Sequence, residues 1–181
     1  MRRFILTGAP GAGKTTLIQA LAERGHAVAR EAATDVNAIM IARGVAHPTA
    51  EPDFVEQIAD LQRERRLALG GELQFHDRSA ICTLALCRFV DLPESPFLAA
   101  ELAEIEREAF YERRALFVDN LGFMTPTVVR RISFEDSLLF EAVHEAVYRE
   151  LGYELVRIPR APLAERVEMI ERLAGSPISQ E

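Results

Sequence analysis

Residues 8–16 read Gly8-Ala9-Pro10-Gly11-Ala12-Gly13-Lys14-Thr15-Thr16, and the first eight match the pattern G-x-x-x-x-G-K-[ST] without a mismatch. A short apolar run, residues 3–7, comes before this stretch, and a helical pattern, residues 14–24, follows it. The glycines allow backbone N–H groups to turn inward around phosphate oxygens, and the helix start adds the positive end of its dipole. The stretch therefore predicts a phosphate-binding loop (P-loop) over residues 8–16. In this loop Lys14 would contact the β- and γ-phosphates of ATP during catalysis, and Thr15 would hold Mg²⁺.

The use of lysine supports this interpretation. The chain has twenty arginines and a single lysine, Lys14, which falls on the motif position that requires a slim, flexible ammonium group. GTPases that recognise guanine through an Asn-Lys-x-Asp segment need a second lysine. That class of GTPase is therefore disfavoured.

Length and composition are those of a folded globular domain. The chain has 181 residues, 49% hydrophobic and 27% charged, which predicts one domain over residues 1–181. A net charge of −7 disfavours broad binding to nucleic acids or anionic membranes. The longest apolar run, residues 80–87, is far shorter than the roughly 20 residues of a membrane span, and two cysteines are too few for a disulfide framework. We expect a cytoplasmic protein with small-molecule partners, and the oligomeric state stays open.

Short apolar runs alternate with longer helical patterns along the chain, which is typical of βαβ units. The pattern predicts an α/β fold with a five-stranded parallel sheet, helices on both faces and a small lid. The expected strands are residues 3–7, 26–30, 72–76, 115–119 and 153–158.

A second group of polar residues, His76-Asp77-Arg78, follows the third expected strand. Ligands bind outside the carboxyl ends of strands in open parallel sheets, so these side chains should face the phosphates. Asp77 could accept a proton from an acceptor hydroxyl or bind Mg²⁺ through water, and Arg78 could bind acceptor phosphate. A surface ion pair between the two is the structural alternative.

Two further carboxylates end neighbouring strands. Glu31 follows the second strand and could bind the acceptor or order the magnesium shell, although a solvated strand end explains it equally well. Asp119 ends the run Leu116-Phe117-Val118 and competes with Asp77 for the metal. We favour Asp77, because a buried central strand would need the apolar run before Asp119 in any case.

Arg130 and Arg131 follow a loop that contains Gly122 and Pro126. A mobile lid could bring these arginines over the transferring phosphoryl group, where they would act as catalytic residues by stabilising charge. A basic pair at a solvated helix start is the alternative.

Several of these segments resemble the NadR-like AAA/P-loop ATPase domain family. The similar segments are residues 3–16, Val28 to Ala33, His76-Asp77-Arg78, residues 130–135, and Leu151 through Pro159. The resemblance implies a nucleoside- or nucleotide-kinase-like fold, with Lys14 and Thr15 on nucleotide and magnesium, Asp77 near the acceptor, and a lid at Arg130–Arg131.

These observations together predict phosphoryl transfer from ATP–Mg²⁺ to a small acceptor that carries a hydroxyl or a phosphate group. The alternative is a nucleotide-dependent regulatory or binding module with little or no transfer. Some relatives in the resembling family phosphorylate nicotinamide riboside, but no segment of this sequence identifies the acceptor.

Overall fold

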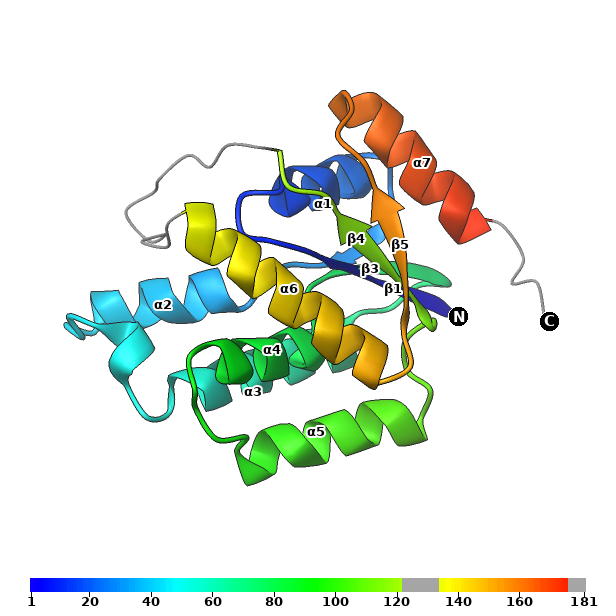
Figure 1. The fold of residues 1–181 in the computed structure, drawn as a ribbon. Helices are drawn as coiled ribbons and strands as arrows, with labels where there is room; N and C mark the ends of the chain where they lie inside the picture. Colours follow the sequence, from blue (N-terminus) through cyan, green and yellow to red (C-terminus); the bar gives the residue numbers. More distant parts are fainter. Residues whose placement is uncertain (122–133, 176–181) are drawn as a thin grey trace.

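A computed structural model of the chain describes residues 1–121 and 134–175. Its centre is a sheet of five parallel strands in the order β2-β3-β1-β4-β5, which confirms the predicted sheet (Figure 1). The strands are β1 Arg2–Thr7, β2 Ala27–Ala29, β3 Leu73–Asp77, β4 Arg114–Val118 and β5 Glu154–Ile158.

The middle strand, β1, is buried on both faces because helices cover the sheet on both sides. Phe4 and Leu6 point to one face, and Ile5 points to the other, and all three are fully buried. A strand covered on both faces reads as a continuous apolar run rather than an alternating one, which is the pattern of residues 4–6.

Helices α1 and α7 cover one face of the sheet, and α3, α4, α5 and α6 cover the other (Figure 1). Helix α2 packs on α3 beside the sheet through a smaller apolar cluster. The α-helices are α1 Lys14–Glu23, α2 Ala33–Ala42, α3 Phe54–Ala68, α4 Ala80–Phe89, α5 Pro96–Arg107, α6 Phe134–Glu150 and α7 Leu163–Gly175, with a 3₁₀ turn η1 at Pro48–Ala50.

The apolar spacing of residues 98–112 predicts a helix there, but helix α5 covers a different range. Helix α5 begins earlier, at Pro96, because the Ser95 hydroxyl accepts a hydrogen bond from the Leu98 N–H and proline suits the first helical turn. It ends at Arg107, and Ala109 then takes the left-handed backbone region with φ of 44°.

The P-loop runs from β1 to α1 and depends on a glycine at position 8. Gly8 has φ of +122°, and a Cβ atom there would lie 2.4 Å from the carbonyl oxygen of Val118 in β4. The close approach of the two backbones therefore requires glycine.

Residues 122–133, which include Arg130 and Arg131, lie outside the described part of the chain, so the predicted lid stays a prediction. Within the described residues, every helix is too short or too polar to span a membrane.

Candidate active site

Lys14 lies beneath the P-loop at the start of α1. Its side chain is buried, and its Nζ atom donates hydrogen bonds to the carbonyl oxygens of Gly8 at 3.0 Å and Ala9 at 2.7 Å. Burial, together with the charge of Arg78, lowers the pKa of Lys14 to about 7. Phosphate oxygens would offer this ammonium far better partners than two carbonyl groups do.

Thr15 of α1 and Asp77 of β3 lie next to each other at the carboxyl end of the sheet. Thr15 Oγ1 lies 3.5 Å from Asp77 Oδ2, while the buried Asp77 Oδ1 has no hydrogen-bond partner among the described residues. Burial, and then the negative charge of Glu31, raise the pKa of Asp77 to about 6. A nearby cation would give Asp77 Oδ1 a partner and would lower the free-energy cost of its buried negative charge.

This oxygen pair fits Mg²⁺ held largely by phosphates and water. Magnesium is a hard cation that is commonly bound through one or two protein oxygens together with substrate phosphates. In the described part of the chain, no three acidic, histidine or cysteine side chains gather into a site that would hold a metal alone. Thr15 and Asp77 are therefore suited to a nucleotide-dependent metal site.

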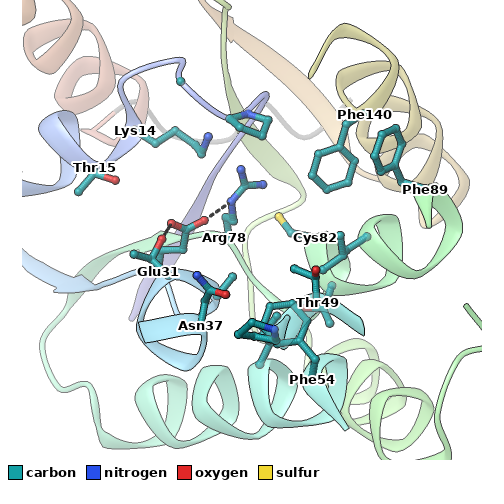
Figure 2. Close-up of a pocket in the computed structure, with 18 of the residues that line it drawn as sticks. Lys14, Thr15, Glu31, Asn37, Thr49, Phe54, Arg78, Cys82, Phe89 and Phe140 are labelled. Carbon is teal, nitrogen blue, oxygen red and sulfur yellow. Dashed lines mark hydrogen bonds and ion pairs between the residues drawn. The ribbon is translucent and has the colours of Figure 1, made fainter. Parts of the chain in front are cut away.

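Glu31 and Arg78 form an ion pair between the ends of β2 and β3, with Arg78 Nε 2.7 Å from Glu31 Oε1 (Figure 2). The Thr34 hydroxyl donates to the other carboxylate oxygen of Glu31 at 2.7 Å. Burial alone would raise the pKa of Glu31, but the positive charges of Arg78 and Lys14 outweigh it and hold that pKa at about 2. Glu31 is therefore ionised at neutral pH and is a weak base.

Arg78 is also held from a second side. Its Nη1 atom lies 3.0 Å from Nε2 of His144, a fully buried residue of α6. His144 Nδ1 lies 2.9 Å from the carbonyl oxygen of Phe140, which can only accept, so Nδ1 carries the proton and Nε2 accepts from Arg78. The backbone of Arg78 takes a left-handed φ of 72° while its N–H donates to the Leu6 carbonyl.

A cavity of about 790 Å³ extends from the P-loop past Glu31 and Arg78 to a region enclosed by α2, η1, α3, α4 and α6. Figure 2 shows Lys14, Glu31 and Arg78 on one side of it and Phe89 and Phe140 on the other. Asp77 does not line this cavity. Its position behind Thr15 suits a metal-side role better than direct contact with an acceptor.

A family model described as AAA domain matches residues 3–166. The chain belongs to the AAA domain family. No curated protein matches the sequence. The match over residues 3–166 confirms the predicted resemblance to this family.

Solved structures with a similar fold include a NadR protein and two kinases. A NadR protein in complex with NR has a TM-score of 0.72 at 17% identity, over 99% of this chain and 53% of that one. A thymidylate kinase from Ehrlichia chaffeensis has a TM-score of 0.61 at 11% identity, over 95% and 97%. A shikimate kinase from Acinetobacter baumannii in complex with shikimate has a TM-score of 0.57 at 15% identity, over 96% and 92%. The chain spans about half the length of the NadR structure, and these likenesses show a NadR-like, P-loop kinase-like fold.

Asp119, the competing metal ligand, lies one residue beyond β4 in this AAA domain. Its Oδ1 accepts from Arg157 Nη1 at 3.0 Å, and Arg157 also pairs with Glu141 and Glu145 of α6. Asp119 thus shares its arginine partner with two glutamates, and it does not line the cavity. This arrangement favours Asp77 for the metal.

Arg166 is a site residue that sequence analysis missed. This buried residue of α7 donates from Nη2 to the carbonyl oxygen of Ala12 at 3.1 Å, 154 positions earlier in the chain. The contact ties α7 to the end of the P-loop. No local pattern marks an arginine of a charged amphipathic helix for this role.

Proposed function

We propose that the protein is a kinase that transfers the γ-phosphoryl group of ATP, with Mg²⁺, to a hydroxyl group of a small acceptor. The observation that carries this proposal is the continuity of the cavity. It joins Lys14 in the P-loop to the Glu31–Arg78 pair and then extends into a compartment with room for a second molecule. A site that only binds the phosphates of a nucleotide needs the P-loop end alone.

Each part of the loop has a role in this proposal. The backbone of residues 8–16 binds the phosphates, and Lys14 leaves the carbonyls of Gly8 and Ala9 for the β- and γ-phosphates. Thr15, with Asp77 beside it, would hold Mg²⁺. When bound, the metal supplies positive charge that offsets the charge on the phosphate oxygens.

The transfer step forms one bond and breaks one. The acceptor oxygen attacks the γ-phosphorus, the bond between that phosphorus and the β,γ-bridging oxygen breaks, and ADP leaves. The hydroxyl proton passes to solvent or to a carboxylate, with Asp77 the stronger base and Glu31 the one that lines the cavity. A loose transition state needs positioning and charge stabilisation more than it needs a strong base. Charge stabilisation is the role that we propose for Arg130 and Arg131.

The test is ADP production by the purified protein with ATP and Mg²⁺, with and without a library of nucleosides, sugars and cofactor precursors. Acceptor-stimulated ADP release that disappears in Lys14→Ala supports the kinase. Calorimetry should show that Lys14→Ala also weakens ATP binding while the protein stays folded. ATP binding without stimulation by any acceptor would favour the nucleotide-dependent module instead.

A further inference from the structure

The far compartment of the cavity is lined mainly by apolar side chains. They come from α2, η1, α3, α4 and α6, and from the segments that join them. The apolar lining includes Ile41, Pro48, Phe54, Leu86, Phe89 and Phe140. Burial of apolar ligand surface against such a wall is favourable. The compartment thus favours an acceptor with a substantial apolar body.

The aromatic rings form one wall of this compartment. The rings of Phe89 and Phe140 lie 4.8 Å apart between centroids at 35°, and both side chains border the cavity across from Thr15 (Figure 2). Phe54 borders it from α3. Flat aromatic walls of this kind bind planar or branched apolar groups well.

The positive charge of the compartment is already compensated. Among the described residues that line it beyond the P-loop, Arg78 is the one arginine or lysine. Its Nε donates to the Glu31 carboxylate at 2.7 Å, and its Nη1 donates to His144 at 3.0 Å. An anionic acceptor would have to compete with Glu31 for Arg78 and would meet the Glu31 charge itself, which costs free energy in a buried site.

The polar groups that remain suit hydroxyls. Glu31 offers carboxylate oxygens, Asn37 lies between Glu31 and Phe54 (Figure 2), and the Thr83 hydroxyl donates to Gln62 at the cavity wall. These groups can accept or donate hydrogen bonds, but none of them carries a positive charge that would neutralise an anionic acceptor.

We propose that the acceptor is a hydroxyl compound with an apolar body and no anionic group, and that Glu31 excludes phosphorylated and carboxylated acceptors by neutralising Arg78. This inference rests on the proposed kinase function and narrows its acceptor. It sets the chain apart from a kinase whose acceptor already bears a phosphate or a carboxylate.

The test compares matched ligands that differ in one anionic group. The pairs are thymidine with thymidine 5′-monophosphate, methyl shikimate with shikimate, and 4-methylbenzyl alcohol with 4-(hydroxymethyl)benzoate. Binding is measured by NMR titration of the protein saturated with AMP-PNP and Mg²⁺. In each pair that binds, we expect the uncharged member to bind at least about tenfold tighter, a difference of about 1.4 kcal/mol. Equal or tighter binding of the anionic members, or binding by no uncharged member, overturns the inference.

Glu31→Gln tests the reason for the preference. This variant keeps the side-chain shape but releases the positive charge of Arg78, so affinity for the anionic members should rise by about tenfold and that for the uncharged members should fall. Glu171→Gln removes a carboxylate that pairs with Arg24 and His26, away from the cavity, and should leave both affinities unchanged. If the folded Glu31→Gln protein still prefers the uncharged members as the wild type does, the proposed role of Glu31 is overturned. The comparison of ligands on the wild-type protein does not depend on either variant.

ADP release measured on the same ligands separates this inference from the kinase proposal. Preferred turnover of an anionic member would leave the kinase in place and overturn the acceptor class. Tight binding of uncharged members without ADP release from ATP would support the acceptor class and count against the kinase.

Discussion

Arg78 and His144 are 66 positions apart in the chain, and their side chains meet at 3.0 Å between Nη1 and Nε2. The contact ties the turn after β3 to α6, a helix that also borders the cavity through Phe140. His144 is buried, and burial together with the Arg78 charge holds its pKa well below the usual value. The neutral ring can therefore keep accepting from Arg78 across the working pH range.

His144→Phe keeps the ring volume and removes the acceptor atom, so Arg78 loses one of its two side-chain partners. We expect KM for an acceptor identified by the ADP assay to rise roughly tenfold, because losing a hydrogen bond to a charged group costs about that much affinity. KM for ATP should stay unchanged. His144→Gln offers an amide oxygen and should restore much of the loss. His26→Phe, which removes the contact with Glu171 and keeps an aromatic ring beside Phe75, is the control. Equal changes in both KM values would point to a general structural effect.

The lowered pKa of Lys14 predicts proton uptake when ATP binds. The folded protein holds this pKa at about 7, so at pH 8 roughly nine-tenths of the Lys14 side chains are neutral. Contact with phosphates favours the charged form, so binding should take up close to one proton at pH 8 and weaken as the pH rises above 7. Calorimetry with Mg²⁺ in buffers of different ionisation enthalpy measures the uptake. At pH 6 Lys14 is already charged, and uptake that persists there would assign the proton to another group.

Substitutions at Gly8 and Gly25 can test whether the close approach of the P-loop to β4 requires a glycine. Both have positive φ, but a Cβ at Gly8 would lie 2.4 Å from the Val118 oxygen, whereas a Cβ at Gly25 would have nothing within 4 Å. Gly25→Ala should cost about 1–2 kcal/mol of unfolding free energy through the backbone conformation alone. Gly8→Ala should cost about 3 kcal/mol or more and abolish ATP binding. Denaturant unfolding of both variants checks the difference, and equal losses would show that the backbone contact with Val118 is not limiting.

Local patterns along the chain were enough to predict much of the fold. The apolar run of residues 4–6, the glycines of the P-loop and the single lysine each report on neighbours close in sequence. The rule that polar residues at the carboxyl ends of parallel strands share one edge also placed Glu31 and Asp77 near the P-loop. That rule needs only the strand assignments.

The contacts that lie beyond these patterns depend on packing between distant helices. His144 is one of several polar residues on α6, and Arg166 is one of several charged residues on α7, so neither stands out in the sequence. The Glu31–Arg78 pair likewise requires β2 and β3 to be neighbours, which hydrophobic pattern alone does not specify. The apolar compartment of the cavity is assembled from separate helices and could be recognised only once they were packed together.

Asp77→Asn tests the metal role of this carboxylate through stability as well as activity. The folded protein raises the pKa of Asp77 from 3.8 to about 6, so protonated Asp77 stabilises the fold below about pH 4, and this contribution is lost as the pH rises through 6. At pH 8 the wild type carries the full cost of a buried, ionised Asp77. The substitution should therefore raise the unfolding free energy of the nucleotide-free protein at pH 8 by roughly 1–3 kcal/mol, and the gain should vanish near pH 4.

The same variant should lose phosphoryl transfer by roughly 10²–10⁴-fold while ATP still binds, because Lys14 and the P-loop amides are untouched. Mg²⁺ should also stabilise the ATP complex of the wild type more than that of the variant in thermal unfolding. Asp119→Asn is the matched control: it breaks the exposed pair with Arg157 and should change stability by about 1 kcal/mol or less, with transfer retained. If phosphoryl transfer survives Asp77→Asn and disappears in Asp119→Asn, we would assign the metal to Asp119. The reason is that the carboxylate that holds the metal is needed in every turnover.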